Sequence, residues 1–144
     1  MEHATRIEVR YAETDKMGIV YHANYLVWLE VARAHFLDSL GFPYAETEKQ
    51  GFMAPVLSVE ITYGSPFTYG DVAMVYTFIT KLSPVRVEYS YRIYAEGEDP
   101  LTCKPRLSAK TTHCLVDAKT FRPVSQKKML PELYAAYQSV LIDD

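Results

Sequence analysis

Residues 23–40 read ANYLVWLEVARAHFLDSL. Apolar side chains recur there every three or four positions, which is the period of an α-helix, at Tyr25, Leu29, Ala32, Phe36 and Leu40. Other apolar side chains stand between these positions, so polar residues do not form a continuous face. A helix of this kind is expected to be covered by protein on most sides. The glycine and proline that follow, Gly41 and Pro43, predict where it ends.

Strand-like segments lie on both sides of this helix. Residues 5–12 alternate apolar and polar side chains, as expected for a strand with one wet face. Four further runs rich in Val, Ile, Tyr and Phe follow the helix, at residues 56–63, 71–81, 85–94 and 106–116. Strands that follow one another through short turns are expected to pair antiparallel.

Two shorter helices complete the predicted order of elements. One spans residues 43–50, and the other begins at Pro131, because proline is favoured in the first turn of a helix. The order predicts an α+β fold with a five-stranded antiparallel sheet around the long helix. No linker divides the chain, so we expect one domain over residues 1–144. The open edges of such a sheet favour self-association.

The bulk composition limits the class of protein. Apolar residues make up 49% of the 144 residues and aromatic residues 13%, which argues against a disordered chain. The net charge of −3 argues against sequence-independent nucleic-acid binding, which needs an excess of Lys and Arg. The sequence has no signal-peptide pattern and no run of about 20 apolar residues. We therefore expect a soluble cytoplasmic protein with no membrane span.

Neither the cysteines nor the histidines form a cofactor pattern. Cys103 and Cys114 are too few for a disulfide framework, so free thiols are expected. The four histidines lack the spacing of metal ligands, and the glycines lack the spacing of a phosphate-binding loop. No serine stands in the G-x-S-x-G context of a Ser-dependent hydrolase. The sequence therefore predicts no metal and no bound cofactor.

Chemistry-bearing residues are densest in YAETDKMGIVYHANY, residues 11–25, which joins the first strand to the long helix. Composition alone favours a polar connection here, with Asp15 in a turn and Gly18 at positive φ. One detail favours a functional loop. No Ser, Thr or Asp directly precedes the helix, so its first N–H groups are free to hold an anion or a polarised carbonyl. The sequence leaves open an alternative in which Asn24 caps a later helix start.

The spacing within this segment resembles the signature of hotdog-fold acyl-CoA thioesterases similar to 4-hydroxybenzoyl-CoA thioesterase and the Tol–Pal-associated thioesterase. The matching positions are Tyr11, Asp15, Gly18-Ile19-Val20 and Tyr21-His22-Ala23-Asn24-Tyr25. Looser agreement extends over roughly residues 5–130. The resemblance implies the hotdog fold, in which a five-stranded antiparallel sheet wraps around a long central helix.

The resemblance also implies catalytic roles. Asp15 is expected to attack the thioester carbonyl or to activate water for that attack. The main-chain N–H of His22 is expected to bind the carbonyl oxygen, while the role of the His22 side chain stays open. Glu13 is interpreted as a solvated turn residue, and Gly18 as the residue that lets the loop bend. The substrate-binding candidates are Tyr11, Gly18, Tyr21, Tyr25, Met53, Pro55, Tyr63, Lys81 and Arg86.

The resemblance further implies a substrate and an assembly. Lys81 and Arg86 are assigned to the nucleotide of CoA, which is part of the substrate and not a cofactor. The pocket candidates fit an aromatic or a short-to-medium acyl group. A homodimer with its sites at the interface is expected, pairing into a homotetramer. Two alternatives stay open: a non-catalytic module that binds acyl-CoA or acyl-carrier protein, and a structural oligomer with a vestigial cleft.

Overall fold

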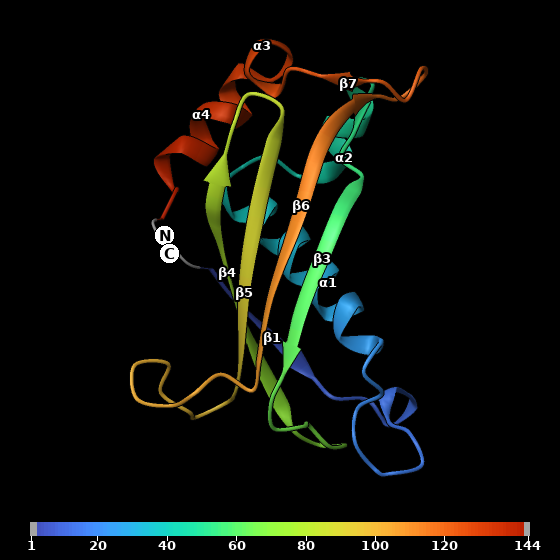
Figure 1. Cartoon of the computed structure of the whole chain (residues 1–144), viewed down its shortest axis with the longest axis vertical. Coiled ribbons are helices and arrows are strands. Elements are labelled where there is room, and N and C mark those ends of the chain that lie inside the picture. Colours follow the sequence, from blue (N-terminus) through green and yellow to red (C-terminus); the bar gives the residue numbers. More distant parts are fainter. Residues whose placement is uncertain (1–2, 143–144) are drawn as a thin grey trace.

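The chain folds into an antiparallel sheet with a long helix against one face, as a computed structural model describing residues 3–142 shows (Figure 1). Five long strands lie in the order β1-β4-β5-β6-β3, and each is antiparallel to its neighbours. They are β1 (His3–Glu8), β3 (Val56–Tyr63), β4 (Val72–Leu82), β5 (Arg86–Ala95) and β6 (Leu107–Asp117). Two further strands, β2 (Phe52–Met53) and β7 (Pro123–Val124), have two residues each and pair with β6.

The three predicted helices occur in the predicted order, together with two short helices that were not predicted. The helices are the 3-10 turn η1 (Tyr11–Glu13) and the α-helices α1 (Asn24–Ser39), α2 (Tyr44–Lys49), α3 (Gln126–Met129) and α4 (Pro131–Ser139). The three predicted helices correspond to α1, α2 and α4, whereas η1 and α3 were not predicted. The predicted α+β architecture is confirmed, and β2 and β7 make the sheet larger than the five strands expected.

The first strand differs from its prediction at one end. Pairing of β1 with β4 ends at Glu8, whereas the alternating pattern predicted a strand up to residue 12. The carboxylate of Glu13 accepts a hydrogen bond from the backbone N–H of Arg10 at 2.8 Å. This bond turns the chain into η1, because an N–H bonded to a nearby side chain is lost to the sheet ladder.

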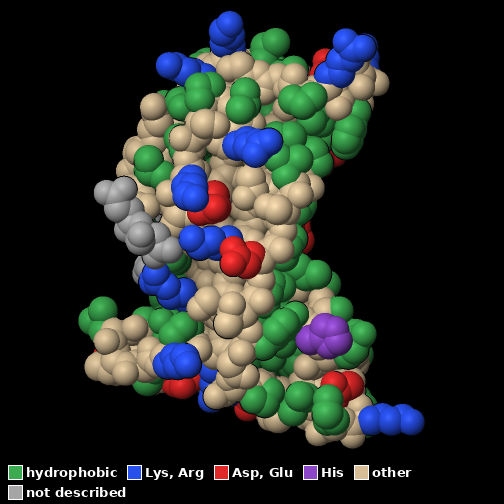
Figure 2. Space-filling view, in the orientation of Figure 1, with side chains coloured by type: hydrophobic (Ala, Val, Ile, Leu, Met, Phe, Trp, Pro, Cys, Tyr) green, Lys and Arg blue, Asp and Glu red, His purple; other side chains and the backbone are tan. Residues whose placement is uncertain are grey.

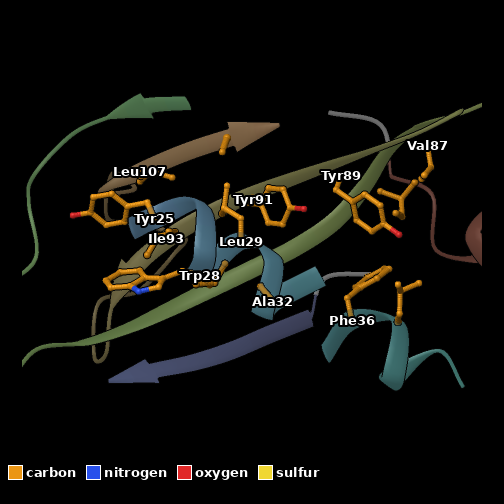
Figure 3. Close-up of a cluster of buried hydrophobic side chains, with 14 of the residues drawn as sticks. Tyr25, Trp28, Leu29, Ala32, Phe36, Val87, Tyr89, Tyr91, Ile93 and Leu107 are labelled. Carbon is orange, nitrogen blue, oxygen red and sulfur yellow. The ribbon is translucent and has the colours of Figure 1, made fainter. Parts of the chain in front are cut away.

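The core lies between α1 and the inner face of the sheet (Figure 3). Trp28, Leu29 and Phe36 of α1 are at most 1% exposed. The ring of Phe36 meets the ring of Tyr89 on β5 edge to face, with centroids 5.9 Å apart. Burial of such large apolar side chains is the main favourable contribution to folding.

The opposite side of α1 is not covered within one chain. Leu26, Val27 and Val31 are 40%, 50% and 38% exposed. The prediction that protein covers this helix on most sides is therefore wrong for the single chain. Apolar side chains of α1 therefore remain on the surface of the single chain.

The cysteines agree with their expected state. Cys103 and Cys114 are both free thiols, the first half-buried and the second buried on β6. Across residues 3–142, no helix is long and apolar enough to cross a membrane.

A buried cation lies next to a buried histidine in the core. The guanidinium of Arg33 donates to Glu30 at 2.9 Å and lies over the rings of Tyr44 and Tyr89. His113 is 1% exposed, and its two ring nitrogens lie 3.3 Å from the Ala54 carbonyl oxygen and 3.0 Å from Thr111 Oγ1. Burial and the nearby Arg33 charge lower the pKa of His113 to about 4. The histidine is therefore neutral near pH 7.

This neutral histidine predicts a loss of stability in acid. His113 has a pKa of about 4 in the folded chain against an ordinary 6.5, so the unfolded chain takes up the proton first as the pH falls. Its contribution is present above pH 6.5 and decreases as the pH falls towards 4, by about 3 kcal/mol of unfolding free energy in total. Urea unfolding at pH 7 and pH 4.5 measures this loss.

The matched variants are His113→Gln and His35→Gln, since His35 is exposed on the same chain. We expect His113→Gln to lose less stability between the two pH values than the wild type. His35→Gln should keep the wild-type pH dependence. Equal acid destabilisation in His113→Gln and wild type would contradict the assignment to His113.

Candidate active site

The loop between η1 and α1 is closed by its own backbone. Tyr21 N donates to the Glu13 carbonyl at 2.8 Å, and Asp15 N donates to the Ile19 carbonyl at 2.9 Å. Gly18 N closes the tip on the carbonyl of Asp15 at 3.0 Å. Gly18 has a φ of +80°, which side chains rarely tolerate, so the predicted role of this glycine in the bend agrees with the geometry. The loop therefore holds Asp15 in a fixed frame.

The carboxylate of Asp15 is half-buried and has an oxygen available for chemistry. Its Oδ1 accepts the backbone N–H of Met17 at 2.8 Å, which is an Asx turn. Within residues 3–142, Oδ2 has no hydrogen-bond partner, and no basic side chain forms an ion pair with this carboxylate. An ionised carboxylate in this setting can act as a nucleophile or as a general base.

The start of α1 lies beside this carboxylate loop and is uncapped. Ala23 is the N-cap residue, has helical backbone angles and offers no side-chain acceptor. The side chain of Asn24 donates to the Glu13 carbonyl at 2.8 Å, so the alternative in which Asn24 caps the helix is wrong. In the described part of the chain, the backbone N–H groups of His22 and Ala23 donate no hydrogen bond. Such groups at a helix start suit a carbonyl oxygen that becomes negative.

Glu13 differs most from its predicted state. It was expected in a solvated turn, but it is 5% exposed. Its carboxylate accepts the N–H of Arg10 at 2.8 Å and the indole N–H of Trp28 at 2.7 Å. Burial alone would raise the pKa of Glu13, but these hydrogen bonds outweigh it and lower the pKa below the ordinary value. The only local signal for this role is the three-residue spacing from Arg10, which is that of a capping box.

Exposed aromatic rings surround the helix start. The rings of Tyr21 and His22 have centroids 4.5 Å apart, and the His22 ring meets Tyr63 at 6.2 Å. The Tyr63 hydroxyl also donates to the His22 carbonyl at 3.3 Å. These three predicted residues therefore lie together in the folded chain.

Of the two other predicted tyrosines, one packs behind this cluster and the other lies on η1. Tyr25 is 5% exposed, and its hydroxyl accepts the N–H of Phe67 at 3.3 Å. It is part of the core behind Tyr63, with ring centroids 5.9 Å apart. Tyr11 is exposed on η1, where its ring meets that of Tyr69 at 5.6 Å.

The remaining candidates lie at the other end of the molecule. Pro55 directly precedes β3, whereas Tyr63 ends it beside His22, so the length of the strand, about 25 Å, separates them. Met53 lies on β2, before Pro55 in the chain. Within one chain, Met53 and Pro55 therefore do not meet Asp15, whereas Tyr21 and Tyr63 lie at the helix start beside its loop.

Lys81 and Arg86 come together at the turn between β4 and β5. They line a surface hollow of about 610 Å³, whose other polar lining residues are Thr80, Ser83, Glu88 and Thr112. Figure 2 shows Lys and Arg side chains on the sheet face of the molecule, including the end where this turn lies. The Glu88 carboxylate accepts a hydrogen bond from Thr80 at 2.7 Å. The two cations against this one carboxylate leave the lining net positive, which suits a phosphate-bearing ligand.

Comparisons with known proteins agree over nearly the whole chain. The family model described as the Thioesterase-like superfamily matches residues 9–136. YneP of Bacillus subtilis (strain 168), provisionally named an acyl-CoA thioesterase, is 44% identical over 132 residues, 92% of each chain. Acyl-CoA thioesterase YbgC of Helicobacter pylori (strain J99) is 29% identical over 134 residues, which cover 91% of this chain and 98% of that one. The solved DHNA-CoA thioesterase from Staphylococcus aureus has a TM-score of 0.88 at 36% identity and covers 96% of this chain and 89% of its own.

Proposed function

Since this chain belongs to the Thioesterase-like superfamily, we propose that it hydrolyses an acyl-CoA thioester to the free acid and CoA, with Asp15 as the reacting carboxylate. Family membership also confirms the predicted hotdog fold. One observation carries the proposal. The same closed loop holds the Asp15 carboxylate, which has an oxygen without a hydrogen bond, and the N–H groups of His22 and Ala23, which donate none among the described residues.

The chemistry needs no further group. A thioester carbonyl is already electrophilic, so a carboxylate can attack it or remove a proton from an attacking water. In either case the carbonyl oxygen becomes negative, and the main-chain N–H of His22 is proposed to stabilise it. CoA then leaves as the thiolate, because a thiolate is a better leaving group than an alkoxide. If water attacked, loss of CoA leaves the free acid. If Asp15 attacked, the acyl group remains on Asp15 as an anhydride, and water hydrolyses it to the free acid and the Asp15 carboxylate.

Thiol release tests this proposal directly. The wild type is given a panel of aryl-, short-chain and long-chain acyl-CoAs, and an acyl-carrier-protein thioester. We expect catalytic turnover of at least one CoA thioester. Binding without turnover across the panel would instead support the alternative of a non-catalytic acyl-CoA or acyl-carrier-protein binding module. Turnover of the carrier-protein thioester alone would change the proposed substrate from acyl-CoA to acyl-carrier protein.

The separation of the candidate residues supports a homodimer. Among residues 3–142, strand β3 pairs with β6 on one side only. Its side chains Val56, Leu57 and Val59 are 44–47% exposed. Leu26, Val27 and Val31 of α1 are likewise exposed in the single chain. A two-fold axis through the edge would pair β3 with its own copy antiparallel. The Pro55 end of one copy would then lie beside the Tyr63 end of the other.

Such a dimer would assemble each site from two chains. Asp15 and the helix start of one copy would face Met53, Pro55 and the β4–β5 turn of its partner. This arrangement accounts for predicted residues at both ends of the chain without any change in the fold. The homotetramer expected from the resemblance stays a prediction.

Arg86 is expected to act on binding and not on chemistry. Replacing it by alanine in Arg86→Ala removes a positive charge from the hollow proposed for the CoA phosphates. We expect KM for the acyl-CoA to rise about 3- to 10-fold while kcat stays within about 2-fold, as for loss of an interaction common to substrate and transition state. The effect should shrink as salt screens the charge.

Arg6→Ala is the matched control, because Arg6 is an exposed arginine of β1, at the edge of the sheet away from β3. Its KM should stay at the wild-type value. An unchanged KM in Arg86→Ala, or a fall in kcat alone, would remove Arg86 from the nucleotide site.

A further inference from the structure

We propose that Glu13 is a positioning residue of this reaction, which holds the Asp15 carboxylate and the oxyanion-binding N–H in one geometry through Trp28. This inference rests on the proposed function of Asp15. It adds to that function a residue that does not touch the substrate.

The Glu13 carboxylate is fully engaged although it is nearly buried. It accepts hydrogen bonds from the Arg10 backbone N–H at 2.8 Å and from Trp28 Nε1 at 2.7 Å. The Arg10 guanidinium lies 3.3 Å away, but its side chain is 73% exposed, so solvent weakens this third contact. The first two bonds therefore fix the carboxylate. They join the segment that follows β1 to the second turn of α1.

The backbone of the same residue binds the other side of the loop. Its carbonyl accepts Tyr21 N and the Asn24 side-chain amide, both at 2.8 Å. Asp15 is two residues after Glu13, and the His22 N–H is one residue after Tyr21. A shift of Glu13 would consequently move both reacting groups, and would move them relative to each other. Small displacements of this kind have large effects on rate, about 10²-fold for 1 Å.

Glutamine is the informative replacement at this position. Glu13→Gln keeps the shape of the side chain but replaces one acceptor oxygen with an NH₂ group. That group would face a donor, either the indole N–H of Trp28 or the N–H of Arg10. Since both are donors, the amide cannot satisfy them as the carboxylate does. The loop should therefore shift while the core stays packed.

Trp28 supplies a spectroscopic measure of the same contact. It is the only tryptophan of the chain, and its indole N–H points at the Glu13 carboxylate. Its fluorescence emission therefore reports on this hydrogen bond without any substrate. A residue with only a structural role would change the folded fraction, but it would not lower kcat in molecules that remain folded.

The experiment measures kcat and KM in wild type, Glu13→Gln, Trp28→Phe and the double variant, with kcat referred to the folded fraction, and tryptophan emission in the two proteins that keep Trp28, wild type and Glu13→Gln. We expect Glu13→Gln to change the emission maximum and to lower kcat about 10- to 100-fold with KM within about 3-fold. Trp28→Phe should lower kcat in the same way. The double variant should be no slower than the slower single variant, because both changes break one link. Glu8→Gln, an exposed glutamate of β1, is the control and should match wild type.

The possible failures are distinguishable. A folded Glu13→Gln variant with wild-type kcat, or effects of the two single variants that multiply in the double variant, would overturn the positioning role. If Glu13→Gln does not fold, Trp28→Phe decides, and wild-type kcat there overturns it equally. A wild type that turns over no thioester would instead refute the proposed function, and the positioning role with it.

Discussion

Replacing Asp15 by asparagine is expected to lower kcat by about 10²- to 10⁴-fold on the best thioester of the panel, as for loss of a catalytic base or nucleophile. The amide is neutral, so it neither attacks a carbonyl efficiently nor accepts a proton from water. Its oxygen can still accept the Met17 N–H that Asp15 Oδ1 accepts at 2.8 Å, so the loop should keep its shape. Thiol release under saturating substrate measures the change in kcat.

A second aspartate offers a matched control for this substitution. Asp99 Oδ1 accepts the backbone N–H of Leu101 at 2.9 Å, which is the same Asx geometry in an exposed loop. Asp99→Asn should therefore keep wild-type kcat and wild-type stability. Substantial turnover by a folded Asp15→Asn variant would refute the role of Asp15, whatever the control shows.

A substitution that breaks the proposed dimer is expected to lower kcat/KM. Val59 lies mid-strand in β3 and is 44% exposed, so Val59→Asp places a carboxylate on the apolar edge without burying it in the single chain. In a two-fold pair this charge would lie close to its own copy and to Glu60 of the partner subunit. We expect the wild type to have the mass of a dimer or larger, and Val59→Asp that of a monomer. We expect kcat/KM to fall about 10²-fold, since half of each site would be missing.

Light scattering and thiol release on the same samples test this prediction. Leu101→Asp is the control, because Leu101 is 94% exposed on the β5–β6 loop and belongs to neither surface. It should keep both the wild-type mass and activity. A monomeric wild type that is fully active, or a monomeric Val59→Asp variant with wild-type kcat/KM, would refute a site shared between chains.

Much of the fold follows from hydrophobic periodicity, and the exceptions have physical causes. The predicted strand at residues 56–63 matches β3 at both ends, because its pattern is bounded by a proline and a glycine. The strands β2 and β7 have two residues each, too few for a period to appear. The predicted end of β1 was wrong because the Glu13 carboxylate accepts the backbone N–H of Arg10, three residues earlier. Pattern arguments do not include such competition.

The candidate site was predictable where it depends on neighbouring residues. Asp15, Gly18 and the uncapped helix start lie within one loop, and local spacing is sufficient to find them. The buried state of Glu13 was not predictable in this way, because its partner Trp28 is fifteen residues later and on another element. The separation of Pro55 from Tyr63 follows from the length of the predicted strand. Which of the two ends lies beside the helix start depends on the packing of the strand, and local spacing does not reveal that packing.

The order of elements along the chain has a consequence for synthesis. Helix α1 ends at Ser39, whereas the strands that bury it, β4, β5 and β6, extend from Val72 to Asp117. A growing chain therefore presents Trp28 and Phe36 to solvent until those strands have left the ribosome. Strand β1 also cannot pair until β4 has been synthesised, since Glu8 pairs with Val72. Apolar surface that is exposed for this interval is where misassembly and chaperone binding compete with folding.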